Sequence, residues 1–106
     1  MAKLSRNKGK RGELEVAHLL TEAGFEARRG QQFKGGGDSP DVVCEALPGY
    51  HIEVKRVEAF ALYPALEQAM ADGHEKDKPL VFHRRNGKPW VVVLRAEDFL
   101  ELVKER

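Results

Sequence analysis

Residues 39–57 decide the fold, because the stretch SPDVVCEALPGYHIEVKRV contains two strand-like segments on either side of a turn. Residues 41–47 are rich in valine, and residues 50–57 alternate apolar with polar side chains. Pro48 and Gly49, between the two segments, are typical turn residues. The stretch therefore predicts a β-hairpin, with residues 50–57 as a central strand of the sheet.

The segments outside the hairpin alternate in type along the chain. Residues 9–23 predict a helix that Ser5 or Asn7 caps and Gly24 ends, and residues 25–29 predict a short strand before a flexible glycine-rich loop at 30–39. After the hairpin come a helix with Pro64 in its first turn and Gly73 at its end, two strands (80–83 and 90–94) around Asn86-Gly87, and a helix over 96–106. The uninterrupted valines at 91–93 predict a strand covered on both faces. The order α-β-β-β-α-β-β-α predicts an α/β fold, a mixed central β-sheet flanked by helices in a single domain, 1–106.

Composition limits the classes of protein that fit. The chain has 106 residues, 42% of them hydrophobic and 33% charged, which is enough for one folded domain. Because it has neither an apolar run of membrane-spanning length nor a secretory leader at its start, we expect a cytoplasmic protein, with no membrane partner. A lone cysteine, Cys44, excludes an internal disulfide framework and a cysteine-rich zinc site, and is expected to be buried.

Charge is distributed unevenly although the formal net charge is only +1. Residues 1–34 hold eight basic and four acidic side chains, so they carry +4 and the remainder −3. Such a basic region, including a basic tail at 1–8, fits a surface that binds nucleic-acid phosphates, and it equally fits a solvated tail.

Three acidic positions are unusual when taken together. Glu13 lies on the apolar stripe of the first helix, Asp41 stands where the loop becomes a strand, and Glu53 shares a strand face with Lys55. Each alone is compatible with ordinary helix-dipole, turn or ion-pair chemistry. Together they suggest a cluster of carboxylates around a hard cation, Mg²⁺ or Mn²⁺, beside a lysine, an arrangement suited to phosphodiester hydrolysis.

The same residues resemble a known family. Ser39-Pro40-Asp41, followed after eleven residues by Glu53-Val54-Lys55, is similar to the PD-(D/E)xK nuclease motif. Lys8-Gly9 before Glu13, the spacing to Gly24-Phe25 and the glycine-rich loop resemble the Holliday junction resolvases of archaea and their phage-borne relatives. The resemblance covers residues 5–57.

This resemblance implies a restriction-endonuclease-like core and a metal-dependent, structure-selective endonuclease that acts as a homodimer on four-way DNA junctions in a prokaryotic or phage-infected cell. It implies that Asp41 and Glu53 bind one or two Mg²⁺ or Mn²⁺ ions, helped by Glu13 and the backbone carbonyl of Val54. Lys55 would assist catalysis, and Gln68 would be an accessory polar contact. The residues expected to contact DNA are Lys8, Lys10, Arg11, Arg28, Arg29, Lys34 and Ser39.

Other features leave alternatives open. The four histidines, His18, His51, His74 and His83, lack close metal-ligand spacing, and only His51 falls on the face of Glu53 and Lys55. Basic residues at the second hairpin tip, Arg84, Arg85 and Lys88, suit either DNA contact or solubility. The same four site residues would serve a nickase or a flap- or mismatch-directed nuclease equally well, and a non-catalytic DNA-binding module is a more distant alternative. We expect the strand at 90–94 and the helix bearing Phe99, Leu100 and Val103 to form the dimer interface.

Overall fold

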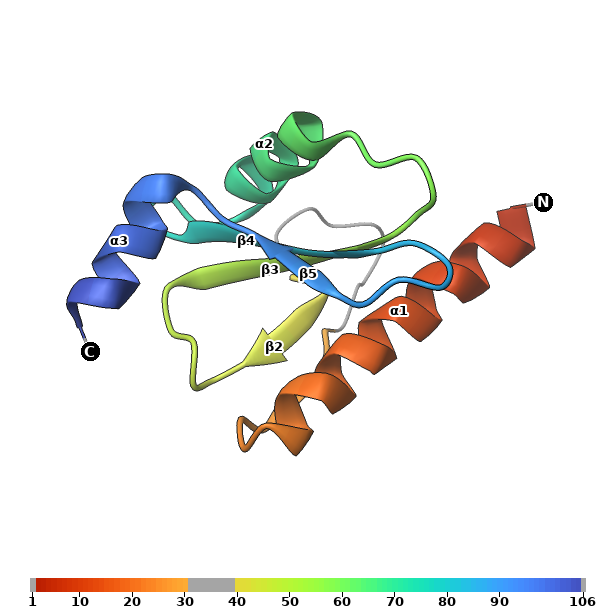
Figure 1. Ribbon diagram of the computed structural model, residues 1–106, viewed down its shortest axis with the longest axis horizontal. Helices are drawn as coiled ribbons and strands as arrows, with labels where there is room; N and C mark the ends of the chain where they lie inside the picture. The colour runs from red at the N-terminus through yellow and green to blue at the C-terminus, as the bar shows by residue number, and fades with distance from the viewer. Residues whose placement is uncertain (1, 31–39, 106) are drawn as a thin grey trace.

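The computed structural model describes residues 2–30 and 40–105, with side chains from Lys8 onward. Within these ranges the elements occur in the predicted α-β-β-β-α-β-β-α order, as three helices and a five-stranded mixed sheet (Figure 1). Their bounds are α1 Ala2–Glu22, β1 Ala27–Arg29, β2 Val42–Cys44, β3 Tyr50–Arg56, α2 Leu62–Asp72, β4 Lys78–Arg84, β5 Val91–Val93 and α3 Ala96–Lys104. The predicted α/β class is confirmed.

The sheet follows chain order, β1-β2-β3-β4-β5. β2 and β3 form the predicted hairpin, with Val42 opposite Ile52. β2 is shorter than predicted because the chain turns directly after it, where the Leu47 amide donates to the Cys44 carbonyl at 3.1 Å. β3 and β4 pair in parallel over seven residues, and α2 makes the crossover between them. β3 is therefore a central strand, as predicted.

Helices cover both faces of the sheet. Val16 and Ala17 of α1 pack with Ile52, Val54 and the buried Cys44 on one face. On the other face, Ala65 and Ala69 of α2 pack against Val81. Because side chains alternate along a strand, the even-numbered residues of β3 face α1 and the odd-numbered ones face α2.

Helix α1 begins earlier than the sequence pattern indicated. It starts at Ala2, so the segment predicted as a basic tail at 1–8 is helical from its second residue. The sequence contains no proline there, and Gly9 is tolerated inside a helix at a cost of about 1 kcal/mol. The basic residues of this segment are therefore carried on a helix. Among the described residues, none of the helices has the length and apolar character that crossing a membrane requires.

Strand β5 differs from its prediction. Val91 and Val92 are each about half exposed, at 48% and 47%, so the expected burial of both faces is wrong. β5 is the last strand of the sheet and pairs with β4 alone, which places it at an edge. Phe82 is buried as expected, and Trp90 is partly buried against the same core cluster.

Candidate active site

Asp41 is fixed to the backbone of the strand that carries Glu53. Its amide donates to the Ile52 carbonyl at 2.9 Å, which aligns the start of β2 with the middle of β3. Its carboxylate oxygen Oδ2 accepts a hydrogen bond from the Val54 amide at 2.8 Å. The Asp41 side chain is thereby held beside the residue that follows Glu53. The hairpin thus brings together the two acids that lie twelve positions apart in the sequence.

The pKa values of the Asp41 and Glu53 carboxyl groups are shifted in opposite directions. Burial raises the pKa of Asp41 to about 7, helped by the hydrogen bond to Glu53 and by the negative charges of Glu53 and Glu13. Burial also acts to raise the pKa of Glu53, but hydrogen bonds with His51 and Asp41, and the positive charge of Lys55, outweigh it and hold that pKa below its ordinary value. The pair therefore carries less than its full negative charge near neutral pH, and a bound cation would favour the fully ionised form.

Glu53 has a second partner on its own strand, because His51 lies two residues earlier on the same face. His51 Nε2 is 2.8 Å from Glu53 Oε1, and both side chains are buried. The hydrogen bond to Glu53 raises the pKa of His51, against the opposing effect of burial. Asp72, at the end of α2, brings a third group, since one ligand atom from each of these three residues lies within 4.8 Å of the others.

Helix α2 also supplies a neighbour for Lys55. The Lys55 ammonium donates to Gln68 Oε1 at 3.3 Å, so the residue predicted as an accessory contact lies beside the predicted catalytic lysine. Gln68 and Asp72 are four positions apart on α2, which places both on one side of the helix. One side of α2 therefore carries a hydrogen-bond partner of Lys55 and a carboxylate close to the His51–Glu53 pair.

Glu13 reaches the cluster from α1. Its side chain is 12% exposed, and its charge contributes to the raised pKa of Asp41. Arg29 of β1 donates from Nε to Glu13 Oε1 at 2.6 Å. Arg29, expected to contact DNA, thus also neutralises an acid of the candidate site. Gly12 lets α1 pack closely against β3, since a Cβ there would lie 2.8 Å from the Cβ of Arg56.

The structure brings Asp41 and Glu53 together, and Glu13 and Lys55 lie close enough for their charges to shift the pKa values of this pair. Lys34 and Ser39, expected to contact DNA, lie outside the described residues, as does most of the glycine-rich loop. Lys10, Arg11 and Arg28 are exposed and accessible to a ligand. Of the four histidines, only His51 belongs to the cluster identified around Glu53.

Sequence reasoning missed Asp72 and the contact between Arg29 and Glu13. The spacing between Gln68 and Asp72 is a signal that could have identified Asp72, because one helical turn separates them. The contact of Arg29 depends on how α1 crosses β1, and no local pattern encodes that crossing.

Two overlapping sets of ligands share Glu53. Asp41, Glu13 and the Val54 carbonyl would complete an all-oxygen set, which suits Mg²⁺ or Mn²⁺. His51 and Asp72 would instead give one nitrogen and two carboxylates, which suits a transition metal such as Mn²⁺ or Zn²⁺. Mn²⁺ is compatible with both sets. Comparisons of the chain with protein-family models, with curated proteins and with solved structures found no match.

Proposed function

We propose that this protein is a metal-dependent, structure-selective DNA endonuclease that resembles Holliday junction resolvases. The observation that carries the proposal is the Asp41 carboxylate held on the Val54 amide, between Glu53 and Lys55 of the same central strand. Acids with opposed pKa shifts beside a lysine are a common arrangement at catalytic centres. The PD-(D/E)xK resemblance assigns this arrangement to phosphodiester hydrolysis.

In this proposal Asp41, Glu53, Glu13 and the backbone carbonyl of Val54 would hold Mg²⁺ or Mn²⁺. The cation, when bound, neutralises negative charge in the transition state and lowers the pKa of a coordinated water. The ammonium of Lys55 orients the attacking water and holds a phosphate oxygen. Gln68 accepts a hydrogen bond from Lys55 and so limits the positions that the ammonium adopts.

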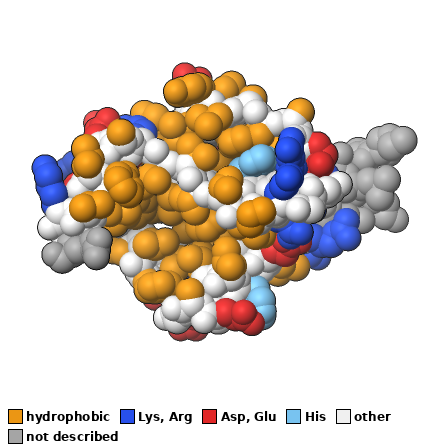
Figure 2. All heavy atoms as spheres, viewed as in Figure 1, with side chains coloured by type: hydrophobic (Ala, Val, Ile, Leu, Met, Phe, Trp, Pro, Cys, Tyr) orange, Lys and Arg blue, Asp and Glu red, His pale blue; other side chains and the backbone are white. Residues whose placement is uncertain are grey.

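A homodimer belongs to the same proposal, because resolving a four-way junction requires two nicks related by a two-fold axis. Hydrophobic side chains gather on the face that includes β5 and α3 (Figure 2). Val91, Val92, Phe99, Leu100 and Val103 are all between 42% and 55% exposed. Two-fold pairing of this surface would cover apolar area that one chain leaves in contact with water.

The test compares a labelled four-way junction with linear duplex, flap and single-stranded DNA, each incubated with and without Mg²⁺. We expect Mg²⁺-dependent cleavage that is fastest on the junction, with two symmetric nicks. Asp41→Asn and Glu53→Gln should abolish cleavage and leave binding unchanged or stronger, since each substitution removes negative charge near phosphates.

Glu45→Gln, at an exposed turn position after β2, is the matched control and should cleave like the wild type. Cleavage at a near wild-type rate by either site variant would contradict the site assignment. A nickase would be favoured by two results together: the protein cleaves one strand of every substrate equally well, and it sediments as a monomer when bound to junction DNA.

A further inference from the structure

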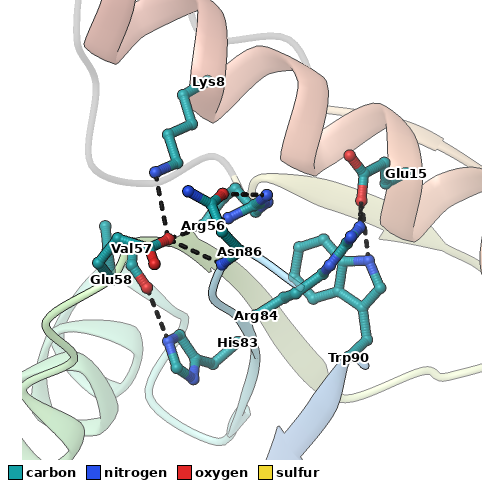
Figure 3. A network of polar contacts seen from close by, with 9 residues as sticks. All are labelled: Lys8, Glu15, Arg56, Val57, Glu58, His83, Arg84, Asn86 and Trp90. Atoms are coloured by element: carbon teal, nitrogen blue, oxygen red, sulfur yellow. Dashed lines mark hydrogen bonds and ion pairs between the residues drawn. The ribbon is translucent and has the colours of Figure 1, made fainter. Parts of the chain in front are cut away.

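A cleft lies beside the candidate active site, on the α1 side of the sheet. It has a volume of about 340 Å³ and is lined by Lys8, Arg11, Glu15, Arg56 and Asn86. Lys8 extends from α1 toward the loop after β3, and Arg56 and Asn86 lie below it (Figure 3). The cleft is thus formed by one side of α1, the end of β3 and the turn that follows β4.

The walls of the cleft are joined by a network around Glu58. Glu58 Oε2 accepts a hydrogen bond from the Asn86 amide at 2.8 Å. Lys8 Nζ and Arg56 Nη1 approach the same oxygen only to 3.4 and 3.5 Å, so both contacts are long. Arg56 Nη2 donates to Asn86 Oδ1 at 2.7 Å, which orients the guanidinium along the cleft. The arginine is therefore held in place by an amide while its ion pair with Glu58 is weak.

Positive charge is in excess here. Four cations lie in or next to the cleft, and two carboxylates face them: Lys8, Arg11, Arg56 and Arg84 against Glu15 and Glu58. Glu15 accepts from Arg84 at 2.6 Å and from Trp90 Nε1 at 3.0 Å. In the described part of the chain, Arg11 makes no ion pair and Arg84 Nε is a buried donor without a hydrogen-bond partner. The cleft is thus suited to an anion.

The cleft adjoins the candidate active site through two pairs of nearby residues. Arg56 directly follows Lys55 on β3, and Arg11 precedes Glu13 by two positions on α1. One strand step covers about 3.3 Å, so the backbones of Lys55 and Arg56 are close together at the end of β3. Because successive residues of a strand point to opposite faces, Arg56 lines the cleft on the α1 face whereas Glu53 and Lys55 lie on the α2 face. A DNA strand that reaches both therefore passes around the end of β3.

We infer that the cleft binds a phosphate of the DNA backbone other than the one that is cleaved, with Arg56 and Arg11 as its principal contacts. This inference rests on the proposed nuclease function. The planar guanidinium of Arg56 presents donors that match phosphate oxygens, and the Asn86 amide lies beside it. A phosphate would compete with Glu58 for Lys8 and Arg56, because its oxygens can contact both cations at once and the contacts that these cations make with Glu58 are long.

The test measures binding of labelled junction and duplex DNA by fluorescence anisotropy without divalent metal, between about 50 and 200 mM salt. Arg56→Gln and Arg11→Gln should each weaken binding about tenfold at low salt and reduce the slope of log K against log salt by about 0.9. Glu58→Gln should strengthen binding, because it removes a carboxylate that competes with phosphate. Lys104→Gln, an exposed lysine in the last turn of α3, is the matched control and should change neither quantity.

Arg11 is exposed, so its variant remains informative if Arg56→Gln fails to fold, which thermal unfolding followed by circular dichroism would reveal. The inference would be overturned if Arg11→Gln and a folded Arg56→Gln both have the same salt slope as Lys104→Gln. Calorimetric titration of the wild-type protein with inorganic phosphate distinguishes a site for free phosphate. Suppose that Arg56→Gln abolishes the binding of inorganic phosphate but leaves the salt slope of DNA binding unchanged. That result would assign the cleft to a small anion and overturn the DNA inference.

The same variants separate this inference from the nuclease proposal. If the wild type cleaves no DNA but the slopes differ as expected, the cleft binds DNA and the nuclease proposal fails. If Asp41→Asn abolishes cleavage while the slopes of the arginine variants are unchanged, the nuclease proposal stands and the cleft assignment fails.

Discussion

Two clusters of charged side chains lie near the end of β3, and they have opposite composition. In the candidate active site, Glu13, Asp41, Glu53 and Asp72 outnumber the permanent cations Arg29 and Lys55. In the neighbouring cleft, four cations outnumber Glu15 and Glu58. The acids of the first cluster are more buried than those of the second: Glu53 is 7% exposed and Glu58 is 50% exposed. A buried excess of acid favours a cation, and an accessible excess of base favours a phosphate, so the pair suits a metal-dependent enzyme acting on a polyanion.

The largest expected effect distinguishes the roles of Lys55 and Arg56, which are neighbours on β3. Lys55→Met should lower the single-turnover cleavage rate by about 10²- to 10⁴-fold, because the proposed function places the Lys55 ammonium on the reacting groups. DNA affinity should fall much less than it does in Arg56→Gln. Rapid-quench cleavage at saturating DNA, paired with anisotropy binding, separates these quantities.

Lys76→Met, at an exposed position before β4, controls for the loss of a surface charge. A Lys55→Met variant that cleaves at the rate of Lys76→Met would remove Lys55 from the chemistry.

A second prediction concerns the pH dependence of stability, which the acid cluster should control. The folded protein binds the Asp41 proton more tightly than the unfolded chain, because the pKa rises from 3.8 to about 7. The contribution of Asp41 to the free energy of unfolding should therefore be fully present below about pH 4. It should fall as pH rises from about 4 through 7 and change little at higher pH. The full shift corresponds to about 4 kcal/mol as an order of magnitude.

Asp41→Asn mimics the protonated acid and keeps an oxygen that can accept from the Val54 amide. It should stabilise the metal-free protein by up to about 4 kcal/mol at pH 8 and change little at pH 4, measured by urea unfolding at both values. Glu58→Gln, in the more exposed cluster, is the comparison and should not show this pH-dependent gain. A destabilised Asp41→Asn at pH 8 would contradict the electrostatic account of the site.

The smallest expected effect concerns Gln68. Gln68→Ala removes the hydrogen bond to Lys55 at an exposed position. It should raise the activation free energy of cleavage by about 1 kcal/mol, which lowers the cleavage rate roughly fivefold. The decrease should appear in kcat rather than in DNA affinity, and Gln68→Glu should restore part of it because its carboxylate also accepts from Lys55. An unchanged kcat in Gln68→Ala would mean that Lys55 needs no support from α2.

Local sequence patterns predicted the fold well wherever periodicity and turn residues determine structure. The alternation at 50–57 and the turn at Pro48-Gly49 gave the β2–β3 hairpin, and Pro64 and Gly73 bracket α2 closely. The burial of β5 was predicted wrongly, because three consecutive valines do not distinguish an edge strand from a central one. The start of α1 was predicted too late, because its first seven residues lack an apolar period although nothing in them breaks a helix.

The candidate site divides in the same way. Spacing along one strand predicted that Glu53, Lys55 and His51 share a face, and the hairpin register placed Asp41 beside them. Asp72 reaches its partners through the packing of α2, and Arg29 reaches Glu13 through the crossing of α1 over β1. In the neighbouring cleft, Asn86 reaches Arg56 from the turn after β4. Those contacts join residues far apart in the sequence, so they depend on tertiary geometry that no local pattern contains.

The central claim is that the acid cluster around Asp41 and Glu53 binds a divalent cation for catalysis. Mn²⁺ titration followed by electron paramagnetic resonance tests it directly, because Mn²⁺ fits both possible ligand sets. The wild type should bind Mn²⁺ at one or two sites, and Asp41→Asn and Glu53→Gln should each lose that binding, whereas Asp72→Asn should retain it. Undiminished Mn²⁺ binding by Asp41→Asn, with binding lost in Asp72→Asn, would place the metal at His51, Glu53 and Asp72 and contradict the account.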